Sequence, residues 1–155
     1  MCANDHFPPQ TCRREGYFVS TDPQLLDVDV VHHYLAEDSY WAAGVARATV
    51  ERGMRHALCF GLYTAAGAQV GFARVVTDFA TFAYLADVFV LRPYRGQGLG
   101  KWLIACILAH PELQGLRRWT LSTRDAHGFY APFGFQPNPK PENQMIFRPP
   151  PAENN

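Results

Sequence analysis

A strand, a tight turn and a helix follow one another between Asp87 and His110, and this unit constrains the fold more than any other part of the chain. Val88 to Leu91 are β-branched, aromatic or aliphatic, which is typical of a buried strand. Pro93 cannot donate to a sheet and predicts the end of that strand. The largely apolar run from Leu99 to Ala109 then predicts a helix.

The turn between them has the composition of an anion site. A helix start leaves backbone N–H groups without intrahelical partners and carries a partial positive charge. Glycines allow a ligand to approach the backbone closely, and three stand at alternate positions: Gly96, Gly98 and Gly100. Arg95 and Lys101 add positive charge at both ends of the turn. The alternative is a glycine-rich turn that serves packing only.

Two common phosphate-binding patterns do not fit this turn. Gly100-Lys101 matches the end of a Walker A loop, but Arg95 replaces its first glycine and Trp102 replaces its magnesium-binding hydroxyl residue. The dinucleotide pattern Gly-x-Gly-x-x-Gly fails because Lys101 occupies the third glycine position. Nucleotide hydrolysis and dinucleotide binding are therefore not expected.

The pattern Arg95-x-x-Gly98-x-Gly100 resembles the pyrophosphate loop of the GNAT superfamily of N-acetyltransferases, Gln/Arg-x-x-Gly-x-Gly/Ala. The strand before the loop and the later Tyr130-x-x-x-Gly134-Phe135 are similar to two further landmarks of that family. The resemblance runs in family order from about Tyr17 to Phe147.

The remaining patterns predict an α/β domain of the same architecture, with a mixed, mostly antiparallel central sheet and helices on both faces. Strands are expected at Tyr17–Ser20, Leu58–Tyr63, Gln69–Val76, Phe82–Leu91, Arg118–Thr123 and Met145–Phe147, and helices at Val28–Leu35, Ala46–Arg55, Leu99–Ala109 and Gly128–Phe133. The strand at Arg118 should pair parallel to the one at Phe82 through a right-handed crossover. We expect a loosely ordered segment over residues 1–16, the acetyltransferase-like domain over 17–148, and a flexible tail over 149–155.

The resemblance implies acetyl-CoA as the donor of an acetyl group. In the family, the pantetheine arm pairs with the strand before the loop, and the pyrophosphate lies on the amides of the turn. The implied cofactor-binding residues are Val88, Phe89, Val90, Arg95, Gly96, Gln97, Gly98, Leu99, Gly100 and Lys101. An Asn that often contacts the cofactor arm is replaced here by Thr123, and His127 is a further candidate contact or a surface residue.

Acetyl transfer to an amine needs a base for the amine and an acid for the departing thiolate. Tyr130 matches the family tyrosine that protonates the thiolate; otherwise it is a packing residue. Regular alternation would place Leu85, Asp87 and Phe89 on one face of their strand, and a carboxylate among apolar neighbours is suited to act as the base. Asp78 and a chain of water molecules are the competing candidates.

The resemblance indicates the chemical class of the acceptor, an amine, and not its identity. In the family, the segment between the first two helices commonly borders the acceptor pocket, so Tyr40 and Trp41 are implied as walls of that pocket or as core residues. The 14 Lys and Arg residues balance 14 Asp and Glu residues, which gives no case for nucleic acid or an anionic membrane as partner. We expect a small-molecule amine, and the family permits a homodimer.

The cysteines and histidines show no metal-ligand spacing, so no metal is expected. The sequence begins without a basic stretch followed by an apolar run, so a reducing cytoplasm is the expected location. Two functions from different classes remain: a working N-acetyltransferase, and a non-catalytic acetyl-CoA-binding regulatory domain.

Overall fold

The computed structural model describes residues 7–151, and these form two compact parts, one ending at Ser122 and one beginning at Thr123. No helix within the described residues has the length and apolar character needed to cross a membrane.

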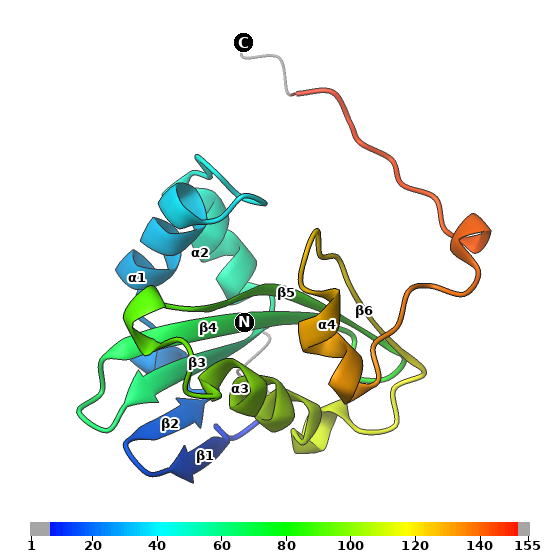
Figure 1. Cartoon of the computed structure of the whole chain (residues 1–155). Coiled ribbons are helices and arrows are strands. Elements are labelled where there is room, and N and C mark those ends of the chain that lie inside the picture. Colours follow the sequence, from blue (N-terminus) through cyan, green and yellow to red (C-terminus); the bar gives the residue numbers. More distant parts are fainter. Residues whose placement is uncertain (1–6, 152–155) are drawn as a thin grey trace. The chain divides into compact units, whose positions relative to one another are not determined.

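The first part is built on one six-stranded sheet with the strands in sequence order (Figure 1). The strands are β1 (Thr11–Arg14), β2 (Tyr17–Ser20), β3 (Leu58–Thr64), β4 (Gln69–Thr77), β5 (Phe82–Val90) and β6 (Arg118–Leu121). Strands β1 to β5 pair antiparallel, and β6 pairs parallel with β5. The predicted mixed, mostly antiparallel sheet and the predicted parallel crossover are both confirmed.

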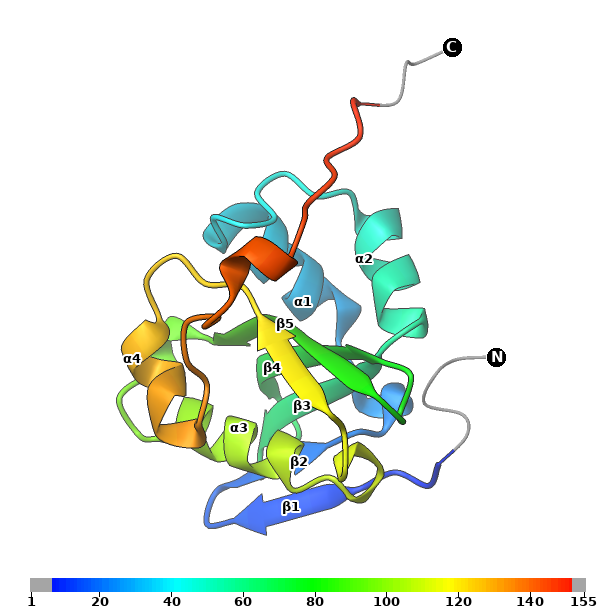
Figure 2. The same ribbon diagram turned by 90° about the vertical axis from the view of Figure 1, so that its right-hand side faces the viewer.

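Helices cover both faces of this sheet, as Figures 1 and 2 show. On one face lie α1 (Val28–His33), begun by the Asp27 carboxylate that accepts from the amides of Asp29 and Val30, and α2 (Arg47–Arg55). On the other face lies α3 (Leu99–Leu108), which buries side chains such as Leu103 and Ile107 completely. The apolar run of α3 and its start after the glycine turn therefore match the sequence prediction.

A bulge interrupts the regular alternation of β5 at Asp87. Arg74 of β4 lies opposite Ala86 and Phe72 lies opposite Phe89, so Ala73 faces two residues of β5, Asp87 and Val88. Asp87 has a φ of 55°, in the left-handed region that Asp tolerates better than most residues.

The bulge reverses one of the sequence predictions. Leu85 pairs with Val75, whereas Phe89 pairs with Phe72, and these two β4 residues are an odd number of positions apart. Because successive side chains of a strand alternate between faces, Leu85 and Phe89 lie on opposite faces of the sheet. The expectation that Leu85, Asp87 and Phe89 share one face is therefore wrong.

The N-terminal segment is more regular than its polar sequence predicts. Residues 1–16 are predicted to be loosely ordered, yet Thr11–Arg14 forms β1 and pairs along its whole length with β2. Backbone hydrogen bonds to an edge strand order this segment, and they need no apolar side chains. Residues 1–6 lie outside the described part of the chain.

The second part holds α4 (His127–Tyr130) and a following 3-10 turn, Ala131–Phe133, which together match the predicted short helix. The predicted strand at Met145–Phe147 is wrong, because these three residues are irregular and 80–98% exposed. Prolines surround this short apolar run, and they favour extended chain without sheet pairing. Of the predicted flexible tail, residues 149–151 carry no helix or strand, and 152–155 are outside the described residues.

The turn between β4 and β5 is organised by the carboxylate of Asp78. It accepts from the hydroxyl of Thr81 and from the amides of Ala80, Thr81 and Phe82. These bonds, led by the Thr81 hydroxyl, hold the pKa of Asp78 well below its usual value because they favour the ionised form.

This turn predicts a pH-dependent contribution to stability. A depressed pKa in the folded state stabilises the protein above the unfolded-state pKa of about 3.9, and this contribution is lost as the pH falls toward the lower folded value. We expect Asp78→Asn to lower the urea midpoint at pH 7 and to differ progressively less from the parent as the pH falls from about 5 to about 2. Asp38→Asn, at an exposed carboxylate, is the control. A difference for Asp78→Asn that stays constant across this pH range would contradict the assignment.

Candidate active site

An unpaired strand edge runs along the second half of β5. Strand β6 pairs only with Phe82–Leu85, so from Ala86 to Val90 this edge has no strand partner among residues 7–151. The opposite edge of β5 stays paired with β4 as far as Val90. Backbone N–H and C=O groups on an open edge are ready to pair with an extended ligand. Val88, Phe89 and Val90, the residues expected to meet the pantetheine arm, lie on this stretch.

The glycine turn that follows β5 exposes a row of backbone donors. Gly96 and Gly98 have φ values of 79° and 75°, and a Cβ built at either would meet no atom within 4 Å. No described residue accepts a hydrogen bond from the amides of residues 96–101, and no side chain caps α3. A run of free amides at a helix start is an anion site in which glycine leaves room for the anion.

Two side chains of the turn hold it in place. The Arg95 guanidinium donates to the Val90 carbonyl at 2.7 Å and to the Tyr34 hydroxyl at 3.0 Å. The Tyr34 ring stacks on Phe89, with centroids 3.9 Å apart. The side-chain oxygen of Gln97 accepts from the Tyr17 hydroxyl at 3.2 Å. Arg95 and Gln97, expected to bind the cofactor, thus also fasten the turn to the sheet and to the helix pair.

Arg14 is a cation beside the turn that the sequence analysis did not identify. Its guanidinium donates to the Gln97 carbonyl at 3.1 Å and lies 5.2 Å from the Trp102 ring centroid. Arg14 is far from the turn in sequence, and only the pairing of β1 onto the sheet edge brings it there. Its charge adds to that of Lys101, which stands exposed in the first turn of α3.

A small cavity of about 120 Å³ lies between the sheet and the helices α1 and α2. Most of its walls are apolar, from side chains such as Val31, Leu35, Val50 and Phe72. Two charged residues, Arg74 and Asp87, also line it.

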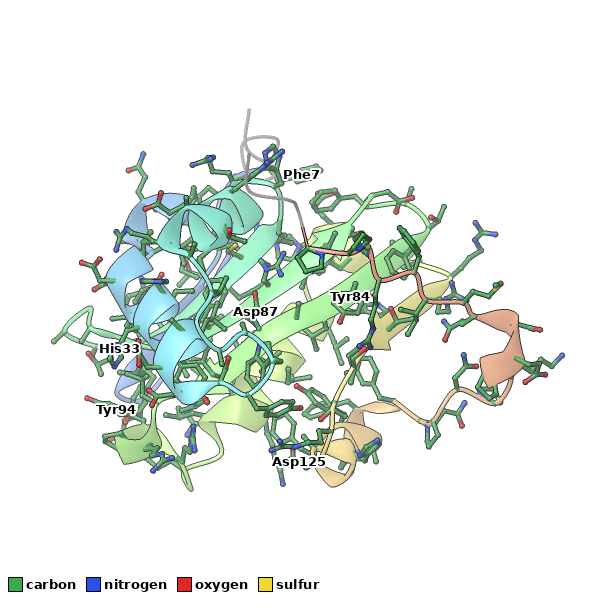
Figure 3. All side chains as sticks on the ribbon, turned by 90° about the horizontal axis from the view of Figure 1, so that it is seen from above. Phe7, His33, Tyr84, Asp87, Tyr94 and Asp125 are labelled. Atoms are coloured by element: carbon green, nitrogen blue, oxygen red, sulfur yellow. The ribbon has the colours of Figure 1, made fainter. Side chains whose placement is uncertain are left out.

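Asp87 connects this cavity with the segment between the two helices. Its side chain is 13% exposed, and its Oδ2 accepts from Arg74 Nε at 2.8 Å. Its Oδ1 accepts from Trp41 Nε1 at 3.1 Å. Figure 3 shows Asp87 on the face of the sheet that carries α1 and α2. The bulge gives Asp87 this position, next to Arg74 on the neighbouring strand.

A π-helical turn, Tyr34–Asp38, directly follows α1. Ser39 orders the segment that follows this turn. Its hydroxyl donates to the Leu35 carbonyl at 2.6 Å and accepts from the amide of Ala42 at 3.1 Å. Trp41 is thereby brought to Asp87. Tyr40 contacts the Trp41 ring edge-on, with centroids 5.2 Å apart. Both rings are nearly half exposed, so they do not act as core residues.

Arg74 is a second site residue that the sequence analysis missed. It is a single charged residue within the apolar run of β4, and that isolation was the signal that could have identified it. Asp78, the competing candidate base, instead accepts local hydrogen bonds. Its carboxylate is occupied by the turn before β5, and the same hydrogen bonds lower its pKa.

The second part contains the other three expected site residues. Thr123 Oγ1 accepts from the amide of Ala126 at 3.0 Å, in the turn before α4. His127 is exposed at the first position of α4. The Tyr130 ring packs edge-on against Phe129 and Phe135, and Gly134 between them has a φ of 97°.

Within residues 7–151, no group of three or more His, Cys, Asp or Glu side chains is arranged to hold a metal ion. The site therefore consists of an open strand edge, a row of free amides and a cavity with one carboxylate and one guanidinium.

Comparison with known proteins gives a consistent result. A family model described as an acetyltransferase (GNAT) domain matches residues 32–137. The Gibberella zeae protein "Putative acetyltransferase FG08082" is 37% identical over 138 residues, which cover 76% of this chain and 77% of that protein.

Two further similarities differ in extent. N-alpha-acetyltransferase 80 of Mus musculus is 39% identical over 74 residues, which cover 46% of this chain and 24% of that protein. A crystal structure of a protein assigned to the GNAT family from Xanthomonas campestris pv. campestris has a TM-score of 0.84 and 47% identity, and the match covers 92% of this chain and all of that one. The fold, the glycine turn and these similarities show that the chain belongs to the GNAT family of acetyltransferases.

Proposed function

We propose that this protein transfers the acetyl group of acetyl-CoA to the amine of a small-molecule acceptor, by direct attack in a ternary complex. One observation carries the proposal: the row of free amides over residues 96–101 follows the open edge of β5, after the short turn Arg92–Tyr94. An extended ligand that ends in a pyrophosphate can use both features at once.

The residues of the first part fit the cofactor that the family uses. The backbone of Val88 and Val90 would pair with the amide groups of the pantetheine arm. The amides from Gly96 to Lys101 would hold the pyrophosphate, and the open space at the glycines leaves room for it. Acetyl-CoA supplies an activated thioester, and the protein supplies the binding and orientation around it.

Asp87 is proposed to receive the proton of the acceptor amine. An amine is largely protonated at neutral pH and must lose a proton before it attacks a carbonyl. Asp87 lines the cavity, and a carboxylate that accepts two hydrogen bonds keeps lone pairs for a third donor. The name of the mouse relative, an N-alpha-acetyltransferase, supports an amine rather than a hydroxyl as the acceptor.

Tyr130 is proposed to protonate the departing CoA thiolate. A phenol hydroxyl carries its proton at neutral pH and is a suitable acid. The support for this role is the similarity of Tyr130, Gly134 and Phe135 to the family pattern. Thr123 and His127 are proposed as further contacts to the cofactor on the same basis.

Gly98→Asn tests the cofactor site. Asn is among the side chains that best tolerate a positive φ, so the turn should keep its conformation while the added side chain fills the space of the anion. We expect acetyl-CoA to bind at least about tenfold more weakly in calorimetry. Gly115→Asn is the matched control, because Gly115 has nearly the same φ, 74°, and equally open surroundings beyond the other end of α3. Equal affinities in the two variants would contradict the assignment.

Asp87→Asn tests the proposed base. Asn, like Asp, tolerates the positive φ at the bulge, and its side-chain oxygen can still accept a hydrogen bond from Arg74. The fold should therefore persist. We expect kcat/KM to fall by roughly 10²–10⁴-fold and its rise with pH to move. An unaltered pH profile would assign the proton transfer to water or to another group.

Tyr130→Phe tests the proposed acid. The variant keeps the ring that packs on Phe129 and Phe135, so the affinity for acetyl-CoA should change little. Single-turnover rates should fall by roughly 10²–10⁴-fold, because only the proton donor is lost. Parent-like single-turnover rates across the pH range would make Tyr130 a packing residue.

A further inference from the structure

The guanidinium of Arg74 has more hydrogen-bond donors than the protein uses. Its Nε donates to Asp87 Oδ2, and no described residue accepts from its two Nη atoms. A guanidinium carries five N–H donors, four of them on these two atoms. The Arg74 side chain is only 24% exposed, so its unused donors lie in a partly enclosed place. A planar pair of such donors matches a carboxylate.

Arg74 borders a cavity that could take that carboxylate. Arg74 lines the cavity, and its Nη1 approaches α2 at Gly53, where a Cβ would lie 3.5 Å from it. At Gly53 the guanidinium therefore meets the backbone of α2 and no side chain, while Thr49, Val50 and Met54 of α2 form other parts of the cavity wall. The remaining walls are mostly apolar, so the charged partners of a ligand in the cavity are Arg74 and Asp87.

These two residues present opposite charges side by side, joined at 2.8 Å. A ligand with an amine and a carboxylate a few atoms apart could place its amine on Asp87 and its carboxylate on Arg74, so that positive and negative groups alternate around the site. A polyamine would place a second ammonium against Arg74, and an amine without an anion would leave the Nη donors unused.

We propose that the acceptor is a small amino acid or a similar compact amine that carries a carboxylate near its attacking nitrogen, and that Arg74 selects it. This inference rests on the proposed acetyl transfer, with Asp87 at the amine. The cavity of about 120 Å³ favours acceptors with short side chains.

Matched pairs of amines test the inference. Glycine, L-alanine and β-alanine would each be compared with the corresponding amide, which keeps the amine and removes the negative charge. Release of CoA thiol gives kcat and KM for each compound. We expect the acids to exceed their amides in kcat/KM by about ten- to a hundredfold, because a charge-assisted pair is lost in the amides. Amides that react as well as the acids would overturn the inference and leave acetyl transfer intact.

Arg74→Gln provides a second and independent readout. This change also removes the partner of Asp87 and can lower the rate with every substrate. The quantity to compare is therefore the ratio of kcat/KM for each acid to kcat/KM for its amide. We expect the ratio to approach one, mainly through a higher KM for the acids, and Arg74→Lys to keep part of it. Arg55→Gln, at an exposed arginine in the last turn of α2, is the control and should leave the ratio unchanged. A preserved ratio in folded Arg74→Gln would overturn the role of Arg74.

Failure of the proposed function has a different signature. In that case acetyl-CoA binds in calorimetry, yet neither these acids and amides nor any other amine in a wider panel releases CoA above the background rate. The inference on the acceptor then falls together with the enzyme assignment.

Discussion

The end of pairing between β5 and β6 after Leu85 is the constraint on which the site depends. A sheet that stayed paired would leave no backbone groups for an extended ligand. Because β5 continues alone to Val90 on this side, its open edge leads directly to the free amides at the start of α3. Arg95 fixes this geometry by bonding to the Val90 carbonyl and to Tyr34, so that strand, turn and helix pair hold one another in place. The proposed donor site thus consists mainly of backbone groups, and its glycines contribute by leaving space for the pyrophosphate.

The β5 bulge determines what the proposed acceptor site can contain. Two residues opposite Ala73, together with the left-handed φ of Asp87, bring the carboxylate next to Arg74 on the neighbouring strand. Trp41 supplies a second donor to that carboxylate, and Ser39 orders the segment that delivers it. The cavity thereby combines apolar walls with one charge of each sign, and this combination carries both the proposed proton transfer and the proposed selection of the acceptor.

The sequence predicted those features that depend on local chemistry. The glycines and Pro93 fix where β5 ends and α3 begins, and the apolar runs fix the order of strands and the parallel β6. The bulge was not predictable from the sequence. A period-two alternation assumes a regular pleat, and an Asp in a strand sequence does not by itself predict a positive φ. The pairing of Arg74 with Asp87 depends on the β4–β5 register, which only the folded sheet sets.

Strand β1 was missed because Thr11–Arg14 lacks an apolar pattern. The opposite error was made at Met145–Phe147, where three apolar residues did not form a strand. The roles of Tyr130, Thr123 and His127 stay predictions from the family pattern.

In the proposed reaction, donor and acceptor bind to one protein and the acetyl group passes directly between them. Incubation with acetyl-CoA labelled in its acetyl group and a mixture of small amines, followed by mass spectrometry, tests this most directly. We expect labelled N-acetyl product and free CoA in equal molar amounts, with no label on the protein. Bound acetyl-CoA that stays intact in the presence of every amine would contradict the account and would identify the protein as a non-catalytic acetyl-CoA-binding domain.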